Sequence, residues 1–594
     1  MNILGISCFY HDSAAALTRD GVLIAAAEEE RFTRVKNDFR FPEEAIAFCL
    51  AEAGLTAADL DYVVYYEKPF VKFERILMSC LQTFPRSYEV FRESMVSWLA
   101  DKLWTQNVIS DRLNLPAAKI IAIDHHASHA ASAFYPSPFE DAAILTVDGV
   151  GEWATASFGV GHGNRISITK EMRFPHSVGL LYSAFTAYLG FEVNEGEYKV
   201  MGMAPYGTPR YVDKVWKLIT LGDDGSFRLN MEYFTFHHSA RHTFSRKFVE
   251  LFGAPRPPGM HFFTPESGYP SYFGPPPSDV TELGRLNQHY ADIASSIQRV
   301  TEEVLLHMAR ALQRETGMKR LCMAGGVALN SVANSRILRE TPFEELYIQP
   351  AAGDAGGAVG AALYAHHQLL GKPRAFVMNH AYWGKSYSDG KAIDWFRSQN
   401  IPHEIARDQD DMLDRVVDSL TSGNVVGWHQ GRFEWGPRAL GCRSILADPR
   451  RADMKDIVNT KIKFREPYRP FAPSVLAEAA ERYFDLPNAI SHYPARYMLL
   501  VVPVRPEHHA TLPAITHVDG SGRLQTVFRD SNPLYYSLIE RFGAATGVPV
   551  ILNTSFNLKG EPIVTTPANA HFTFSQSDMD LLVVGNVLVR KRPR

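Results

Sequence analysis

Cysteine is scarce in this sequence, and the few cysteines are far apart. The 594 residues contain five of them: Cys8, Cys49, Cys80, Cys322 and Cys442. No two of them form a Cys-x-x-Cys pair, which argues against a disulfide framework and against a structural zinc ribbon. We therefore predict a protein of the reducing cytoplasm.

The sequence also lacks a strong net charge and a long apolar run. A formal net charge of -4 gives no general electric field for binding nucleic acid. No apolar run reaches the length that spans a bilayer, and the N-terminus, Met1 to Ser7, lacks the basic region of a signal peptide. The composition, 46% hydrophobic and 21% charged, is that of a globular protein of several domains. We therefore expect small molecules as partners, and neither nucleic acid nor a membrane.

The usual nucleotide-binding and metalloprotease motifs are absent as well. There is no Gly-x4-Gly-Lys-Ser/Thr loop and no His-Glu-x-x-His. The segment Gly159-Val-Gly-His-Gly163 has neither the spacing nor the strand-to-helix context of a dinucleotide fingerprint. If the protein binds ATP, it does so on a different scaffold.

Short apolar runs alternate with amphipathic segments, which indicates an α/β protein. Residues 3–27 are predicted to form a three-stranded meander, with Asp20-Gly21 as a hairpin turn. Residues 41–54 have an early proline, early acids and a terminal glycine, the start and stop signals of a helix. A second such series begins near Lys119, so the first lobe is compatible with two meander-and-helix halves.

The pattern breaks between Lys372 and Asp389, where proline, glycine and aromatic residues are frequent. We predict a domain boundary there, with residues 1–372 as one domain and residues 373–594 as a second α/β domain. Residues 254–279 are rich in the same residue types and are predicted to be an inserted loop. This loop either shapes a substrate pocket or is a surface excursion, and the sequence favours neither.

Two histidines and two aspartates form the most informative pattern in the chain. His125 and His129 are four residues apart and therefore share one face of a helix. Asp148 follows an apolar run that is typical of a buried strand, and Asp354 stands in a glycine-bearing turn before an Ala-rich helix. Imidazole and carboxylate ligands suit iron or manganese, with zinc as an alternative. Taken singly, each residue is more often an unrelated surface histidine or turn aspartate.

Basic residues are concentrated from Gly431 to Pro473, which contains seven arginines and three lysines against five acidic residues. Arginine can hold two phosphoryl oxygens at once and lysine supplies a mobile point charge, so this clustering indicates a clamp for a small polyanion. An exposed basic helix with its stems packed on aromatic residues is an equally good interpretation for any one of these basic residues. The residues concerned are Arg438, Arg443, Lys463 and Arg469.

Six ordered motifs resemble the O-carbamoyltransferases of the nodulation and antibiotic-tailoring family, over nearly the whole chain. They are His125-His-Ala-Ser-His-Ala-Ala-Ser-Ala, Gly196-Glu-Tyr-Lys-Val-Met-Gly, Gly325-Gly-Val-Ala-Leu-Asn330, Gly436-Pro-Arg-Ala-Leu-Gly, Lys463-Phe-Arg-Glu-Pro-Tyr-Arg-Pro-Phe-Ala-Pro and Leu552-Asn-Thr-Ser-Phe-Asn557. The resemblance implies an N-terminal lobe of the actin-like ATPase fold, similar to the tRNA threonylcarbamoyl-transfer protein. It implies a C-terminal YrdC-like α/β lobe, similar to the threonylcarbamoyl-adenylate synthase.

In this family the C-terminal lobe joins carbamoyl phosphate to ATP, giving carbamoyl adenylate and pyrophosphate, and the N-terminal lobe passes the carbamoyl group to a hydroxyl. The implied acceptor is a small-molecule alcohol of the sugar, aminoglycoside or polyketide type, and Mg2+ is expected with ATP. The resemblance implies an iron site made by His125, His129, Asp148 and Asp354. It places His11 and Lys36 at the adenylate phosphate and the acceptor.

The remaining residues that the resemblance assigns bind the cofactor and carbamoyl phosphate. In the N-terminal lobe they are Lys199, Gly325, Gly326 and Asn330, and in the C-terminal lobe Lys463, Arg469, Arg523 and Asn553, with Arg438 as a weaker candidate. Cys442 departs from the family, which usually has asparagine there, and this puts one local contact of its turn in doubt. For the general base that deprotonates the acceptor we predict His11 or His126.

Two other functions use the same residues. A tRNA-modifying enzyme would share the adenylate chemistry, but the slight acidity of the chain argues against it. An actin-like ATPase that acts only as an interaction module would leave the C-terminal basic residues unexplained. The sequence does not identify the acceptor, the metal that is bound or the oligomeric state.

Overall fold

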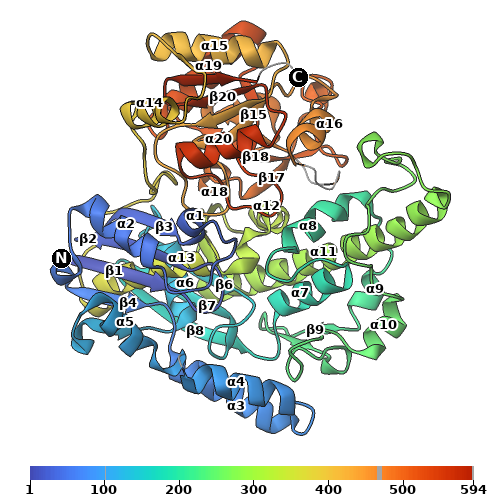
Figure 1. Cartoon of the computed structure of the whole chain (residues 1–594). Coiled ribbons are helices and arrows are strands. Elements are labelled where there is room, and N and C mark those ends of the chain that lie inside the picture. Colours follow the sequence, from blue (N-terminus) through green and yellow to red (C-terminus); the bar gives the residue numbers. More distant parts are fainter. Residues whose placement is uncertain (101, 464–467, 469–470, 592–594) are drawn as a thin grey trace. The chain divides into compact units, whose positions relative to one another are not determined.

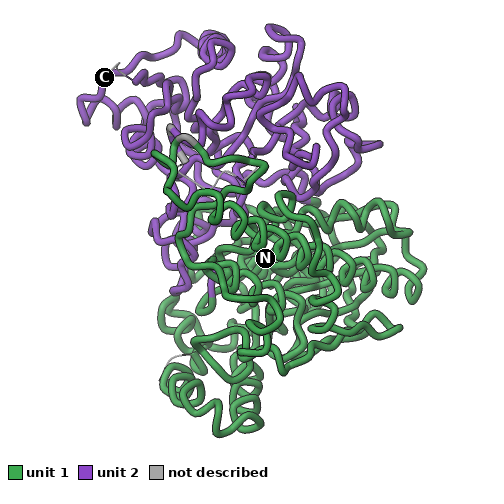
Figure 2. The backbone as a smooth tube through the Cα atoms, turned by 90° about the vertical axis from the view of Figure 1, so that its right-hand side faces the viewer, with its two compact units in different colours: residues 1–10, 14–24, 53–377 green, residues 11–13, 25–52, 378–594 purple. Residues whose placement is uncertain are grey.

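A computed structural model of the chain describes residues 1–100, 102–463, 468 and 471–591 (Figure 1), and gives only the backbone of three of these: Ser271, Lys461 and Lys463. The predicted ligand Arg469 and the side chain of Lys463 therefore lie outside the described residues. The chain forms two compact units (Figure 2). Unit 1 comprises residues 1–10, 14–24 and 53–377, and unit 2 comprises residues 11–13, 25–52 and 378–594.

The first sheet begins with the predicted meander. Its strands have the order β3-β2-β1-β4-β5 and are β1 (Asn2–Ser7), β2 (Ala14–Arg19), β3 (Val22–Glu28), β4 (Tyr62–Tyr65) and β5 (Ile120–Ala122). β1 pairs antiparallel with β2 and parallel with β4. Asp20 and Gly21 both have positive φ, as a two-residue type I′ turn requires, so the predicted hairpin is confirmed.

The second sheet of unit 1 repeats this topology. Its order, β8-β7-β6-β11-β12, combines an antiparallel meander with two parallel strands. The strands are β6 (Asp141–Val147), β7 (Ala154–His162), β8 (Arg165–Arg173), β11 (Arg320–Ala324) and β12 (Glu345–Tyr347). Two copies of one five-stranded topology are the arrangement of the actin-like ATPase fold, so the fold class predicted for the N-terminal lobe is confirmed.

Helices and a few short strands complete unit 1. The long helix α11 spans Val280–Thr316. The other elements are α3 (Pro69–Thr83), α4 (Tyr88–Ala100), α5 (Thr105–Leu113), α6 (His125–Phe134), α7 (Val178–Tyr188), α8 (Glu197–Met203), α9 (Val212–Val215), β9 (Ile219–Leu221), β10 (Phe227–Leu229), α10 (Arg246–Phe252), α12 (Ser331–Glu340) and α13 (Asp354–Tyr364). No helix of the described residues is long and apolar enough to cross a membrane.

Unit 2 is built on a mixed nine-stranded sheet of the order β13-β21-β20-β14-β15-β19-β16-β18-β17. The strands are β13 (Glu404–Ile405), β14 (Val426–His429), β15 (Arg443–Ala447), β16 (Ala472–Leu476), β17 (Leu500–Pro503), β18 (Ser521–Val527), β19 (Val550–Ser555), β20 (Leu581–Val584) and β21 (Val587–Arg590). Its helices are α14 (Asp389–Ser398), α15 (Gln409–Thr421), α16 (Met454–Val458), α17 (Ala480–Tyr483), α18 (Tyr493–Arg496), α19 (Pro533–Thr546) and α20 (Pro567–Ser575). Trp428, Ile551 and Val583 from the sheet share a core with α15 and α19.

An N-terminal segment belongs to unit 2. It contains α1 (Glu30–Thr33) and nearly all of α2 (Glu43–Ala53). A carboxylate oxygen of Glu28 accepts a hydrogen bond from the backbone amide of Gly436 at 2.7 Å, and the buried guanidinium of Arg31 donates to the Gly436 carbonyl at 2.5 Å. Arg34 donates to the carbonyls of Pro562 and Ile563 at 2.7 and 2.6 Å. These contacts span more than 400 residues, and no local sequence signal indicates them.

Candidate functional site

The four predicted metal ligands meet in the interior of unit 1. Nε2 of His125 lies 3.0 Å from Nε2 of His129, 3.3 Å from Oδ2 of Asp148 and 3.6 Å from Oδ1 of Asp354. Nε2 of His129 lies 4.0 Å from the same oxygen of Asp148 and 3.5 Å from that of Asp354. All four ligand atoms lie within 4.8 Å of one another, and all four residues are buried.

These separations fit a divalent ion. Four ligand atoms about 2.1 Å from one ion lie roughly 3.4 Å apart at tetrahedral corners and about 3.0 Å apart at adjacent octahedral corners. The observed distances, 3.0 to 4.0 Å, span these values. Two imidazoles and two carboxylates are ligands that suit iron or manganese, with zinc as the alternative, as the sequence predicts. The cluster can therefore hold such an ion.

The cluster also has the electrostatics of a cation site. Burial disfavours a charged imidazole, but the carboxylates of Asp354 and Asp148 outweigh it and raise the pKa of His125 to about 9. Burial likewise disfavours ionised Asp148, yet its hydrogen bond with His125 and the charge of His129 hold its pKa well below the ordinary value. Without an ion, His125 therefore keeps a proton that compensates the two carboxylates.

A glycine turn after β11 holds Asp148. The backbone amide of Gly326 donates to Oδ1 of Asp148 at 2.8 Å. Gly325 has a φ of 94°, and a Cβ there would lie 2.2 Å from the carbonyl oxygen of Val147, so only glycine fits. Two residues predicted to bind the cofactor therefore hold a candidate metal ligand in place.

Two helices bring the remaining ligands together. His125 and His129 lie on α6, and Asp354 begins α13, which packs directly against α6. A Cβ on Gly360 of α13 would lie 1.8 Å from the carbonyl oxygen of Ser128 on α6. The absence of a side chain at Gly360 therefore permits the spacing of the two helices, and with it the distance between Asp354 and the histidines.

Charged residues that the sequence analysis missed hold both ends of α6. The buried carboxylate of Glu152 accepts hydrogen bonds from the backbone amides of His125, at 3.0 Å, and Lys68, at 2.7 Å. At the other end, Arg374 donates to the carbonyls of Phe134, at 3.0 Å, and Ser137, at 2.7 Å. An acid at the N-terminus and a base at the C-terminus complement the helix dipole. Glu152 lies only four residues after Asp148, but nothing in the sequence relates it to α6.

A buried ion pair also lies beside the cluster. Nζ of Lys72 is 2.5 Å from a carboxylate oxygen of Glu67, which is 3.9 Å from Nδ1 of His125. Lys72 also lies over the ring of Tyr10, at 4.7 Å from its centroid. The sequence analysis missed this pair, because no motif relates Glu67 and Lys72 to the histidines of α6. The carboxylate of Glu67 adds negative charge next to His125.

His126 differs from its two histidine neighbours. It is buried, and its Nδ1 lies 2.6 Å from the hydroxyl of Thr146, which is hydrogen-bonded to Ser157. Burial and the charges of His125 and His129 lower the pKa of His126 to about 3. These are the properties of a neutral histidine packed between α6 and β6, and they argue against the predicted role of His126 as a general base.

The other predicted residues of unit 1 belong to α8 and to the N-terminal end of α12. Lys199, on α8, lies over the ring of Phe191 at 5.7 Å from its centroid. Asn330 caps α12 by accepting from the backbone amide of Ala333, and its side-chain amide exchanges two hydrogen bonds with that of Gln298. Both predictions of cofactor binding stay predictions.

In unit 2, the predicted ligand Asn553 belongs to a buried polar network. Its amide nitrogen lies within 3.2 Å of the carbonyl of Ala439, the hydroxyl of Ser474 and the side-chain oxygen of Gln525. Its own oxygen has no hydrogen-bond partner in the described residues. Such an acceptor is costly to leave unpaired, which supports a ligand or a water molecule beside Asn553. Arg438 and Arg523 are both half-buried.

Arg443 has a structural role. It is fully buried, and its guanidinium donates to the carbonyls of Gln430, Cys442 and Thr565. A carboxylate oxygen of the equally buried Glu434 accepts from the backbone amides of Cys442 and Arg443. The two residues fix the turn that contains Gly436-Pro-Arg438. Arg443 lies buried in β15, so neither interpretation given above holds for it: it is not on an exposed helix, and its guanidinium already binds backbone carbonyls instead of a polyanion.

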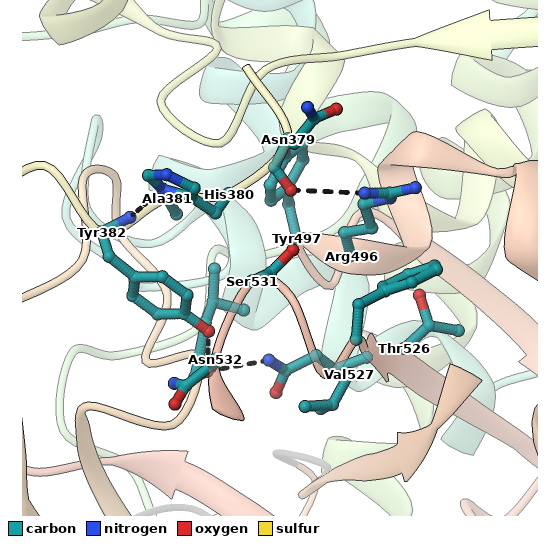
Figure 3. A pocket seen from close by; sticks show the side chains of 13 residues that line it. Asn379, His380, Ala381, Tyr382, Arg496, Tyr497, Thr526, Val527, Ser531 and Asn532 are labelled. Atoms are coloured by element: carbon teal, nitrogen blue, oxygen red, sulfur yellow. Dashed lines mark hydrogen bonds between the residues drawn. The ribbon is translucent and has the colours of Figure 1, made fainter. Parts of the chain in front are cut away.

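A small cavity of about 20 Å3 lies next to the polar network that joins Gln525 to Asn553 (Figure 3). Its lining includes Tyr382, Arg496, Gln525 and Asn532. The volume is enough for roughly one water molecule. The described part of unit 2 thus has a small cavity beside Gln525, a hydrogen-bond partner of Asn553, and the cavity is too small for a nucleotide.

The predicted residues His11 and Lys36 are both grouped with unit 2. Nδ1 of His11 lies 2.9 Å from a carboxylate oxygen of Asp12. Because that oxygen accepts, Nδ1 carries the proton and Nε2 keeps its lone pair. The roles of His11 and Lys36 stay predictions.

Family models match both parts of the chain. The model described as carbamoyltransferase N-terminus matches residues 2–363, and the model described as carbamoyltransferase C-terminus matches residues 417–591. The chain belongs to the carbamoyltransferase family. The predicted resemblance is confirmed, and the protein is a transferase enzyme.

Several relatives match the carbamoyltransferase over most of its length. The uncharacterized protein sll1178 of Synechocystis sp. is 47% identical over 99% of this chain and 97% of its own length. Nodulation protein NolNO of Sinorhizobium fredii is 38% identical over 98% of this chain and 79% of its own. Nodulation protein NolO of Bradyrhizobium diazoefficiens is 39% identical over 79% of each chain. The crystal structure of T. kodakarensis HypF overlaps 62% of this chain and 48% of its own, at 14% identity and a TM-score of 0.31.

Proposed function

We propose that the protein is an ATP-dependent O-carbamoyltransferase with two reaction steps. In the first, carbamoyl phosphate, ATP and water give carbamoyl adenylate, phosphate and pyrophosphate. In the second, the oxygen of an alcohol acceptor attacks the carbamoyl carbon, the bond to AMP breaks, and the acceptor proton passes to a base. The acceptor is a small-molecule alcohol of the sugar, aminoglycoside or polyketide type. Membership of the carbamoyltransferase family supports the transfer itself.

The adenylate-forming step is assigned to the C-terminal part of the chain, which we propose is YrdC-like. Lys463, Arg469 and Arg523 bind the phosphates of carbamoyl phosphate and of ATP with its Mg2+, because cations that converge on a small polyanion neutralise its charge. Asn553 contributes its buried side-chain oxygen, which accepts no hydrogen bond within the described residues and so suits an amino group of the ligand. Arg438 is a weaker candidate for the same site.

The transfer step is assigned to unit 1. The single observation that carries this assignment is the buried cluster of His125, His129, Asp148 and Asp354. These four residues would hold a divalent ion, Fe2+ in first place, which would supply positive charge near the phosphate of the departing AMP. Lys199 and Asn330 bind the nucleotide in this unit. For the base that accepts the acceptor proton we keep His11, whose Nδ1 lies 2.9 Å from a carboxylate oxygen of Asp12.

Two variants separate the steps. Lys463→Ala is expected to abolish release of pyrophosphate from ATP and carbamoyl phosphate. His129→Ala is expected to retain that release and to lose the transfer. The transfer is measured by mass spectrometry as the gain of one carbamoyl group on a panel of neutral and amino-sugar alcohols. If both variants release pyrophosphate at the wild-type rate, the assignment of the steps to the two units is wrong.

A further inference from the structure

The hairpin of α3 and α4 has an apolar surface that the described residues of the chain leave exposed. The two helices lie side by side at one edge of unit 1, away from its sheets (Figures 1 and 2). Of the nineteen large hydrophobic side chains that are exposed in the described residues, eight belong to the hairpin and its flanks, with exposed fractions of 40 to 71%. They are Phe70, Met78, Leu81, Phe84, Tyr88, Val96, Leu99 and Trp104.

The exposed residues follow one spacing on both helices. Positions i, i+4, i+8 and i+11 form a single stripe along a helix, as one face of an amphipathic helix requires. On α3 these positions are Phe70, Glu74, Met78 and Leu81, and on α4 they are Tyr88, Arg92, Val96 and Leu99. The hairpin has a separate inner contact between Phe73 and Trp98, whose ring centroids are 6.1 Å apart. Each helix therefore has a second apolar stripe beyond the one that folds the hairpin.

The area of this surface suits a protein partner of standard size. A large aromatic side chain has about 150–250 Å2 of surface, so the four aromatic residues of the set, roughly half exposed, offer on the order of 400 Å2, and the four aliphatic ones add to this area. A stable complex buries about 800 Å2 on each partner, whereas monomers seldom expose so large an apolar patch.

The charges on the hairpin favour a second copy of the same chain. The α3 stripe contains an acid, Glu74, and the α4 stripe contains a base, Arg92; within the described residues neither forms an ion pair. In a two-fold dimer the same patch meets itself, so it must be complementary to itself, and a patch with one charge of each sign meets that condition. The exposed charges Glu74, Arg86, Arg92 and Glu93 cancel, so the hairpin lacks the basic face of a helix that binds anionic membranes.

We propose that the α3–α4 hairpin is the interface of a homodimer. The hairpins of two copies pack face to face as four helices, bury the two apolar stripes, and place Glu74 of each copy near Arg92 of the other. The proposal concerns assembly alone and does not depend on the acceptor or on the metal.

Sedimentation or light scattering of the full chain tests the proposal across nanomolar to micromolar concentrations. The wild type is expected at twice the 66.5 kDa of one chain. The variant Leu81→Glu/Leu99→Glu is expected to be a monomer with an unchanged circular dichroism spectrum and unfolding temperature. Phe572→Glu, which places the same charge on an exposed hydrophobic position of α20, is the matched control and is expected to remain dimeric.

Charge reversal distinguishes pairing of two hairpins from other contacts. Glu74→Arg and Arg92→Glu are each expected to weaken the dimer several-fold, because each brings like charges together, and the double variant is expected to recover it. A wild type that is monomeric at micromolar concentration overturns the proposal. A dimer that survives Leu81→Glu/Leu99→Glu also overturns it, since the interface must then lie elsewhere.

Discussion

Replacing Gly360 by alanine tests whether the spacing of α6 and α13 holds the metal ligands together. The added Cβ would lie 1.8 Å from the carbonyl oxygen of Ser128, and real contacts of this kind are at least 3.0 Å long. The helices must therefore separate by about 1.2 Å, the difference between these two distances. Metal–ligand bonds tolerate deviations of only about 0.2 Å, so Asp354 can no longer bind the same ion as His125 and His129.

We expect Gly360→Ala to lower the affinity for Mn2+, a convenient probe of the site, at least about 10-fold, as loss of a supporting contact usually does. Overpacking should also cost about 1–3 kcal/mol of stability. Pyrophosphate release should persist. Calorimetric titration with Mn2+ measures the first effect, and thermal unfolding measures the second. The control is Gly390→Ala in α14, where a Cβ meets no atom within 4 Å and should stabilise by about 0.5–1 kcal/mol.

If Gly360→Ala binds Mn2+ as tightly as the wild type and unfolds at the same temperature, then this glycine does not determine the spacing of the ligands. A loss of Mn2+ affinity in Gly390→Ala as well would have the same meaning, because that position is remote in sequence and belongs to unit 2.

Further variants test other parts of the structure. Glu152→Ala removes the acceptor of the buried amide of His125, at a cost of about 1–3 kcal/mol, and of the half-buried amide of Lys68. The variant should weaken Mn2+ binding about 10- to 100-fold, whereas Glu152→Gln, which keeps an acceptor oxygen, should weaken it less. Equal Mn2+ affinities of the wild type and Glu152→Ala in calorimetry would exclude a role of Glu152 in orienting α6. Burial raises the pKa of Glu30 from 4.5 to about 7, so the folded state keeps a proton that the unfolded state loses in this range, and stability should fall as the pH rises from about 4.5 to 7. Glu30→Gln should abolish this pH dependence, and above pH 7 its free energy of unfolding should exceed that of the wild type by on the order of 3 kcal/mol. Parallel curves of unfolding temperature against pH for the two proteins would contradict this prediction.

Part of the site follows from local sequence. The spacing of His125 and His129 predicts that both point to one side of a helix, and the structure contains that helix from its first histidine onward. The apolar run before Asp148 predicts a buried strand, which is β6. Each of these predictions depends only on periodicity within one element, and for this reason the sequence is sufficient.

Other predictions required knowledge of neighbours that are remote in the chain. Whether Arg443 binds a phosphate or a carbonyl depends on what surrounds it, and the surroundings are the carbonyls of Gln430 and Thr565. The role of Gly326 as a hydrogen-bond donor to Asp148 likewise joins residues 178 positions apart. A sequence pattern gives the type of a side chain but not its partners.

By itself, the sequence determined the first β-hairpin, the histidine helix, the strand before Asp148, the ligand types at the cluster and the family of the enzyme, because each of these depends on local periodicity or on ordered motifs. Only the tertiary structure decided that Asp354 meets His125 and His129, that Glu152 anchors their helix, and that the segment containing Arg31 belongs to unit 2. The physical reason is that these contacts arise when separate elements pack, and packing depends on shape and buried polar groups that one-dimensional patterns do not record.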